Sequence, residues 1–158
     1  MKKWNLIAVL FFSVMAVQAQ VVTLDPVFAT QYDSVTIYFD ASQGNGDLAG
    51  TVPVYAHTGV ITNSSTSPTD WQNVQGNWGS HDPKVLMTHV GGNIHKLKIL
   101  IHDFYLLSST DTVSALAFVF RNGAGTTVGR AADGGDIFVP IYQQGFAVSI
   151  TAPTNGNV

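Results

Sequence analysis

Residues 85–101 read Val-Leu-Met-Thr-His-Val-Gly-Gly-Asn-Ile-His-Lys-Leu-Lys-Ile-Leu-Ile, and this stretch decides the fold. Two strand-like runs, Val85–Val90 and Ile94–Ile101, are separated only by Gly91-Gly92-Asn93. A short connection of Gly and Asn between two such runs is typical of a β-hairpin, because these residues reach the backbone conformations of tight turns. The sequence therefore predicts a pair of antiparallel strands here.

Further strand-like runs lie on both sides of this hairpin. Val35, Ile37 and Phe39 alternate with polar residues, the period of two that a half-buried strand shows. Residues 115–120 are apolar on both faces, which is typical of a central strand. They lead into Arg121-Asn122-Gly123, a second tight-turn pattern.

The remaining pattern fits the same architecture. Residues 52–57 form another strand-like run, and Pro140 within the run 137–142 favours an edge position because proline cannot donate to a sheet. We expect a helical turn only at residues 103–109. Six or seven short strands at this spacing predict an all-β fold, an immunoglobulin-like antiparallel β-sandwich.

Composition excludes several functions. The 158 residues are 46% hydrophobic but only 11% charged, with seven Lys or Arg, ten Asp, no Glu and no Cys. The absence of Glu disfavours a helical bundle and the Glu pair common in glycosidases, and the absence of Cys excludes thiolate chemistry. Clustered cations, which nucleic-acid binding needs, are missing beyond the first three residues.

The two ends of the chain differ from the middle. Lys2 and Lys3, the apolar run 6–17 and the small residues before Gln20 predict a secretory signal peptide over residues 1–19. The apolar run is shorter than the roughly 20 residues that span a bilayer, so we expect no membrane span. We therefore expect an exported protein, in the periplasm, on the cell surface or outside the cell.

The expected module covers residues 20–145. Residues 146–158 resemble the start of a strand and a turn, which indicates a linker or the beginning of a truncated following domain. A C-terminal edge strand with a frayed tail is the alternative interpretation.

The most informative segment for function is the polar stretch 62–84. A loop of this length in a compact domain is usually functional or disordered, and Trp71 and Trp78 argue against disorder. Tyr55 and His57 precede it on one face of a strand. Flat aromatic rings among hydroxyl-seeking side chains suit sugar rings, so Tyr55, His57, Trp71 and Trp78 are the candidate carbohydrate-binding residues. The alternative is that both indoles cover one end of the sandwich as buried plugs.

Catalytic patterns are weak. Histidines are scattered without metal-ligand spacing, although His89 and His95 flank the hairpin turn and are candidate cross-strand neighbours. Asp133-Gly134-Gly135-Asp136 lacks the closing Glu of an EF-hand, so a plain polar turn is the better interpretation. We expect no cofactor, no metal and no catalytic activity in this chain.

Several separated motifs also agree in order with a known type of module. They are Val54-Tyr55-Ala56-His57-Thr58-Gly59-Val60-Ile61-Thr62, Ser67-Pro68-Thr69-Asp70-Trp71, Trp78-Gly79, Leu116-Ala117-Phe118-Val119-Phe120-Arg121-Asn122 and Gly134-Gly135-Asp136-Ile137-Phe138-Val139. In these motifs, residues 24–148 resemble an amino-terminal module of secreted Bacteroidetes glycoside hydrolases of the α-amylase type. The outline is also similar to the starch-binding modules of families 25 and 26.

This resemblance implies an immunoglobulin-like sandwich that binds α-glucan as the accessory of a catalytic barrel C-terminal to this chain. It implies His57 or Tyr55 as the strand partner of the sugar and Trp71 and Trp78 as the loop partners. Arg121 and Asn122 are the nearest positions for the polar ligands of those families. The alternative function is a structural spacer or interaction module that binds no sugar.

Overall fold

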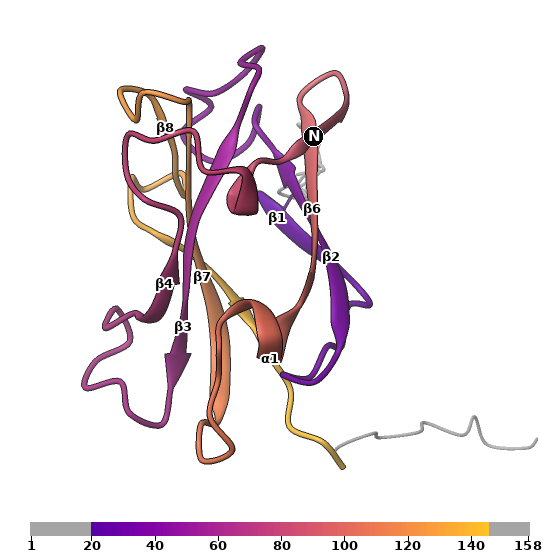
Figure 1. The fold of residues 1–158 in the computed structure, drawn as a ribbon. Helices are drawn as coiled ribbons and strands as arrows, with labels where there is room; N and C mark the ends of the chain where they lie inside the picture. The colour runs from indigo at the N-terminus through magenta and orange to yellow at the C-terminus, as the bar shows by residue number, and fades with distance from the viewer. Residues whose placement is uncertain (1–19, 146–158) are drawn as a thin grey trace, which may run out of the picture.

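Two antiparallel sheets pack face to face in the computed structural model, which describes residues 20–145 (Figure 1). The expected signal peptide and the segment 146–158 lie outside these residues. The first sheet contains β1 (Val22–Asp25), β2 (Ser34–Asp40), β6 (Ile94–Leu100) and β5 (Thr88–Gly91), in that order. The second contains β4 (Gln72–Gln75), β3 (Tyr55–Thr62), β7 (Val113–Arg121) and β8 (Val128–Gly129), and β9 (Ile137–Pro140) also pairs with β7. Two short helices, η1 (Pro83–Val85) and α1 (Ile101–Phe104), complete the described elements.

The topology is that of an immunoglobulin-like sandwich. An immunoglobulin domain orders its strands ABED in one sheet and CFG in the other. In chain order, β1, β2, β3, β5, β6 and β7 correspond to A, B, C, D, E and F, and β4 adds a strand beside β3. The expected fold class is therefore confirmed.

The last strand of the second sheet is interrupted. Along β7, Phe120 pairs with Gly129 of β8, and Phe118 pairs with Ile137 of β9. β8 and β9 therefore follow one another along the same side of β7. The chain between them leaves the sheet, and an ion pair between Arg130 and Asp136 closes the base of this excursion.

The core lies between the sheets and is built from the inward faces of the central strands. Val35, Ile37 and Phe39 on β2 are almost completely buried, as their alternation predicts. Phe39 stacks on Phe120 of β7 with ring centroids 3.8 Å apart, so this contact joins the two sheets directly. Phe118 is also buried, and its ring stacks with that of Phe120.

A buried chain of hydrogen bonds also crosses from α1 into the second sheet. Thr58 Oγ1 lies 2.6 Å from the hydroxyl of Tyr105 and donates its own proton to the carbonyl of Ala117, at 2.8 Å. Since the threonine proton is used, the tyrosine hydroxyl donates to Thr58. Burial raises the pKa of Tyr105 well above its usual value, so the phenol stays neutral and remains a donor.

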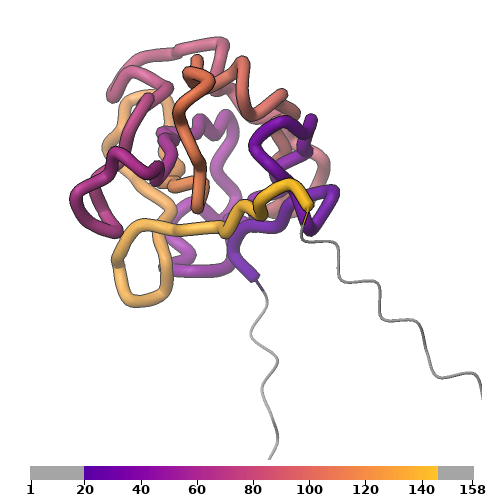
Figure 2. The backbone as a smooth tube through the Cα atoms, turned by 90° about the horizontal axis from the view of Figure 1, so that it is seen from below, coloured from indigo at the N-terminus to yellow at the C-terminus, as the bar shows by residue number. Residues whose placement is uncertain are grey.

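The segment after β9 closes the end of the sandwich. Tyr142 donates its backbone N–H to the carbonyl of Ala29 at 2.8 Å and forms a parallel bridge with Thr30. Figure 2 shows this segment, in yellow, beside the indigo chain that leads into β2. The described part of the chain thus ends in contact with its own beginning.

Most predicted strands are present, and their bounds show where the prediction was wrong. The hairpin over Gly91-Gly92-Asn93, the central position of β7 and the edge position of β9 are confirmed. The expected run 52–57 instead begins at Tyr55 and continues to Thr62, because Pro53 has no N–H to donate and the strand passes through Gly59. The predicted helical turn at 103–109 is found earlier, at Ile101–Phe104.

Candidate functional site

The outer face of β3 carries the candidate residues. Val54, Ala56 and Thr58 point into the core, so Tyr55 and His57 point to the other side of the sheet, as predicted. In the register of the sheet, His57 lies opposite Val119 of β7. The candidate site is therefore on the solvent side of the second sheet and away from the core.

Trp71 lies flat against this outer face at a position that only glycine permits. A Cβ atom placed on Gly59 would lie 3.3 Å from both Cβ and Cε3 of Trp71 and 2.9 Å from the carbonyl oxygen of Gln72. The Trp71 indole is tilted against His57, with ring centroids 5.9 Å apart, and meets Phe138 of β9 edge-on at 6.4 Å. Trp71 is half-buried.

Trp78 is the second indole that contacts His57. Its ring is perpendicular to the imidazole, with centroids 5.2 Å apart, and 49% of the residue is exposed. Its Nε1 approaches Gly125, where a Cβ would lie only 2.8 Å away. The indole therefore rests against the turn between β7 and β8 and keeps about half of its surface open to solvent.

These four side chains, His57, Trp71, Trp78 and Phe138, form a continuous surface that we call the aromatic face. His57 is fixed within it, because its Nδ1 lies 2.7 Å from the carbonyl oxygen of Gly76. A carbonyl can only accept, so Nδ1 carries a proton in this contact, and Nε2 is the nitrogen that is free of it. Phe138 is 38% exposed and was not predicted as a site residue.

Arg121 holds the loop that carries Trp78. The side chain is completely buried, and its two terminal nitrogens donate to the carbonyls of Asn77, Ser80, Asn122 and Gly123 at 2.7–3.1 Å. The first two carbonyls belong to the Trp78 loop and the other two to the turn after β7. One guanidinium thus joins the two segments that surround Trp78, and burial lowers its pKa.

Two of the residues suggested by sequence are too deep to reach a ligand. Tyr55 is only 5% exposed, because the Arg121 guanidinium lies 5.1 Å above its ring and His81 meets it edge-on at 5.7 Å. Tyr55 therefore supports the loop and offers no ring to a sugar. The suggestion of Arg121 as a polar ligand is also wrong, because every contact it makes is internal to the fold.

The two tryptophans differ from one another in the exposure that separates the two interpretations of the sequence, because Trp71 is half-buried and Trp78 is 49% exposed. Neither is a plug at the end of the sandwich, since both cover the outer face of β3. Trp71 packs against the strand, whereas Trp78 is open. The long loop is also shorter than expected, because β4 forms within it and pairs with β3 through Thr58 and Val60.

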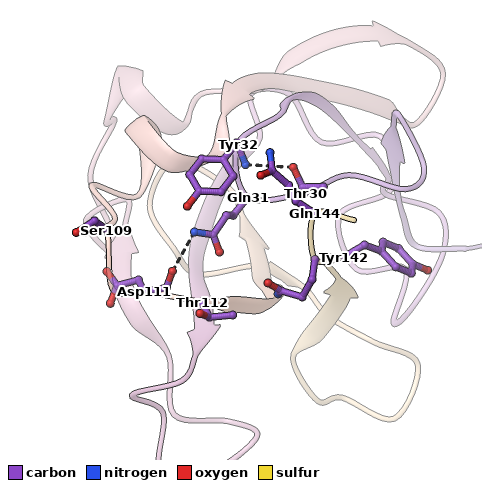
Figure 3. A pocket seen from close by; sticks show the side chains of 9 residues that line it. Thr30, Gln31, Tyr32, Ser109, Asp111, Thr112, Tyr142 and Gln144 are labelled. Atoms are coloured by element: carbon purple, nitrogen blue, oxygen red, sulfur yellow. Dashed lines mark hydrogen bonds between the residues drawn. The ribbon is translucent and has the colours of Figure 1, made fainter. Parts of the chain in front are cut away.

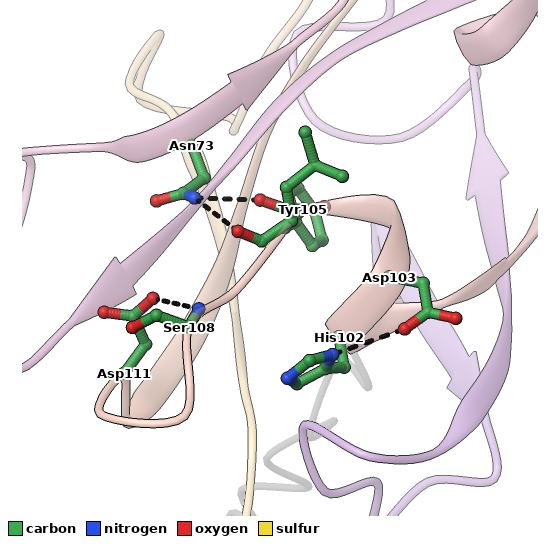
Figure 4. Close-up of polar contacts among 7 residues, drawn as sticks. Asn73, His102, Asp103, Tyr105, Ser108 and Asp111 are labelled. Carbon is green, nitrogen blue, oxygen red and sulfur yellow. Dashed lines mark hydrogen bonds and ion pairs between the residues drawn. The ribbon is translucent and has the colours of Figure 1, made fainter.

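Polar side chains secure β4, and Figure 4 shows one of these contacts, from Asn73 to the backbone after α1. Asn73, with a φ of 52°, donates its amide to the carbonyl of Tyr105 at 2.8 Å. Lys84 donates to Gln75 Oε1 at 2.6 Å and to the carbonyl of Phe104 at 3.1 Å. The loop after β3 is thus tied to α1 on one side and, through Arg121, to β7 on the other.

A polar depression of about 220 Å³ lies elsewhere, at the end of the sandwich (Figure 3). Gln31 is buried within it, accepts from the backbone N–H of Val113 and donates to the carbonyl of Asp111, both at 2.9 Å. Gln143 donates to the carbonyl of Val113 at 3.0 Å. Because these amides already bond to the backbone, the depression is a structural joint between β2, β7 and the segment after β9.

The histidine pair predicted across the hairpin is present. His89 lies opposite His95 in the register of β5 and β6, with ring centroids 5.1 Å apart. His95 is buried, and burial together with the nearby His89 lowers its pKa.

Among residues 20–145, no group of three or more His or acidic side chains is arranged to hold a metal ion. Within the same range, no helix is long and apolar enough to cross a membrane.

Fold and site together define a small immunoglobulin-like β-sandwich with an aromatic surface on its second sheet. The chain belongs to the family described as a domain of unknown function, DUF8578, whose model matches residues 22–128. The matched region includes His57, Trp71, Trp78 and Arg121, and ends at β8, before Phe138. No curated protein matches the chain.

Proposed function

We propose that this protein is a non-catalytic carbohydrate-binding module that takes a sugar chain on its aromatic face. The observation that carries the proposal is the state of Trp78, which is about half exposed although its loop is held by buried hydrogen bonds from Arg121. Exposing an indole to water has a cost in free energy, and fixing it in place removes the entropy that binding would otherwise lose. A fixed, open indole suits a ligand with a flat apolar face.

The surroundings of Trp78 fit a pyranose ring. Its C–H face can stack on the indole, while its hydroxyls can bond to polar groups beside the face, among them Asn77 and His57. Stacking of one aromatic ring contributes about 1 kcal/mol beyond the area that it buries. A face with one open indole and three partly covered rings is therefore expected to bind with a Kd in the millimolar to micromolar range, about −4 to −8 kcal/mol.

The proposed ligand is starch-like α-glucan, and the support for this choice is the resemblance to amino-terminal modules of α-amylase-type enzymes and to families 25 and 26. In this proposal the protein is exported by its N-terminal segment and acts beside a catalytic domain that follows it. The module would then raise the concentration of glucan near that domain.

The test is isothermal titration with maltoheptaose, with cellohexaose and xylohexaose as controls for linkage and sugar. We expect heat with maltoheptaose alone and a loss of at least tenfold in affinity in Trp78→Ala. The melting temperature should change little, because the ring is half exposed and leaves no core cavity.

Phe28→Ala is the matched control variant, since Phe28 is an exposed aromatic at the other end of the fold and should leave affinity unchanged. Folded protein that gives no heat with any of the three sugars would falsify the proposal. Equal loss in Phe28→Ala would show that the aromatic face is not the site.

A second candidate function, an interaction module for a neighbouring domain, is favoured by a different surface. Val27, Phe28 and Tyr142 are 68%, 74% and 40% exposed, and Phe28 and Tyr142 meet edge-on with centroids 5.3 Å apart. Apolar side chains gathered in this way often mark a protein contact. The Phe28→Ala variant separates the two functions, because it removes this surface and leaves the aromatic face intact.

A further inference from the structure

The outer face of the first sheet carries a second, chemically different surface. Thr36 and Tyr38 point outward from β2, since their neighbours Val35, Ile37 and Phe39 are buried. The residues of this surface, which we call the basic face, are Thr36, Tyr38, Thr88, Lys96 and Lys98, and with the backbone at Leu97 they line a depression of about 340 Å³.

The register of the sheet brings these groups together. Tyr38 lies directly opposite Lys96, and Thr36 lies opposite Lys98. On the other side, Thr88 of β5 is also opposite Lys96. Directly opposite side chains in antiparallel strands have Cβ atoms about 5 Å apart, and Lys96 and Lys98 are about 7 Å apart along their strand. Tyr38 therefore has Lys96 opposite it and Thr36 and Lys98 in the next row of the sheet, and Thr88 lies beyond Lys96 on β5.

The two lysines of the basic face are the cations that the fold itself does not use. The described residues hold five Lys or Arg, of which Arg121 binds four carbonyls, Arg130 pairs with Asp136, and Lys84 binds Gln75 and Phe104. Among the same residues, Lys96 and Lys98 make neither an ion pair nor a stacking contact with an aromatic ring. Both are exposed.

Charge elsewhere on the same face is limited. Asp25 lies at the edge of the row that contains Thr36 and Lys98, and Asp40 already accepts from the backbone and hydroxyl of Ser42. The chain between residues 20 and 145 carries ten Asp against five Lys or Arg, a formal charge of −5. Two adjacent unpaired cations on such an acidic protein are the place where an anionic group is least repelled.

We propose that the basic face is a second carbohydrate site, specific for an acidic sugar that carries a carboxylate. The sugar ring stacks on Tyr38, its carboxylate lies between the ammonium groups of Lys96 and Lys98, and its hydroxyls bond to Thr36 and Thr88. The site is on the opposite sheet from the aromatic face and uses none of its residues, so this proposal does not depend on the function proposed for Trp78.

The experiment is titration of the whole protein with a short oligomer of galacturonic acid at low salt. Inorganic sulfate is the control for an anion that carries no sugar, and maltoheptaose is the control for a sugar that carries no charge. We expect millimolar binding of the oligouronide, at least tenfold weaker binding in Lys96→Gln/Lys98→Gln, and at least threefold weaker binding in Tyr38→Ser. Added salt should weaken the interaction.

Lys84→Gln is the matched control, because it removes one positive charge outside the basic face and should change affinity less than twofold. Trp78→Ala should leave oligouronide binding intact, which separates this site from the aromatic face. Melting temperatures identify any variant that fails to fold, and the double lysine variant alters only exposed side chains. Absence of oligouronide binding, equal affinity for sulfate, or equal loss in Lys84→Gln would each overturn the proposal.

Discussion

At the scale of single residues, Gly59 determines how closely Trp71 approaches β3. A methyl group at residue 59 would lie 2.9 Å from the carbonyl oxygen of Gln72 and 3.3 Å from the Trp71 ring. We expect Gly59→Ala to lower the free energy of unfolding by about 1–3 kcal/mol, since crowding in a well-packed site forces its neighbours apart. Chemical denaturation measures this loss, and a changed tryptophan emission spectrum would report displacement of Trp71. An unchanged spectrum and an unchanged stability would show that the contact between Gly59 and Trp71 tolerates a methyl group, contrary to this prediction.

The hydroxyl oxygen of Tyr105 is a single atom that we expect to contribute to stability. This hydroxyl is the first donor of the buried chain through Thr58 to Ala117. Tyr105→Phe removes this donor and leaves the ring in place, so we expect a loss of about 1 kcal/mol in the free energy of unfolding. Tyr32→Phe is the control, because Tyr32 is 49% exposed and should lose almost nothing. Equal effects of the two substitutions would contradict the role given to the buried hydroxyl.

At the scale of elements, the loop that presents Trp78 depends on one guanidinium. Arg121→Met keeps much of the side-chain volume but leaves four backbone carbonyls without their donor. Hydrogen bonds to charged groups contribute about 1.5–3 kcal/mol each, so we expect the variant to lose at least 3 kcal/mol of stability. It should also lose glucan binding, because Trp78 is no longer held.

Arg130→Met is the matched control for this loss. Arg130 is partly exposed and makes one ion pair, with Asp136. Exposed ion pairs contribute about 0–1 kcal/mol, so its stability should decrease only slightly. Denaturant titration of the two variants provides the comparison, and similar losses would show that the buried network is not what holds the loop.

The short strand β4 is the element that sequence reasoning missed. Gln72-Asn73-Val74-Gln75 is mostly polar and only four residues long, and with Val74 as its one β-branched residue it lacks the alternation and the β-branched run that indicate a strand. Its partner β3 and the amide of Asn73 impose the strand conformation through contacts that are distant in sequence. Patterns within a window of residues cannot contain that information.

The site was predictable to the extent that residue chemistry decides it. Tryptophans in a polar loop identified Trp71 and Trp78, and alternation in β3 placed Tyr55 and His57 on one face of the strand, without showing that this face points outward. Burial of Tyr55 was not predictable, because it depends on Arg121 folding back over the ring. Phe138 was missed because β9 lies beside β7, 80 residues from His57 in the chain.

At the scale of the whole molecule, stability should depend on pH through His95. Burial and the facing His89 lower the pKa of His95 below its usual value of about 6.5, so the folded state holds this ring neutral. As the pH falls below about 6.5, the unfolded chain therefore takes up a proton at His95 that the folded chain does not. Stability is complete above that pH and decreases as the pH is lowered through the interval below it.

Melting temperatures between pH 5 and pH 8 test this dependence. We expect a decrease toward pH 5 in the native sequence, a smaller decrease in His95→Gln, and an unaltered slope in the control His102→Gln, whose side chain is at the surface. A native profile that is flat across this range, or one that His95→Gln leaves unchanged, would assign the pH response to other groups.

The fold class was the most predictable feature at this scale, because it follows from turns and alternation repeated along the chain. Six or seven short strands separated by turns predicted a sandwich, and the structure has two facing sheets. The division of the last strand into β8 and β9 was not evident, since its two parts are joined only through their common partner.

The segment 130–136 between the two parts of this divided strand is a position where residues can be inserted. Both flanks of residues 130–136 are held by β7, and the Arg130–Asp136 pair closes the base, so added residues would extend away from both sheets. Each doubling of a flexible loop costs only about 0.6 kcal/mol of closure entropy. A peptide tag or a fluorescent reporter inserted after Asp133 should therefore be carried without disturbing either outer face.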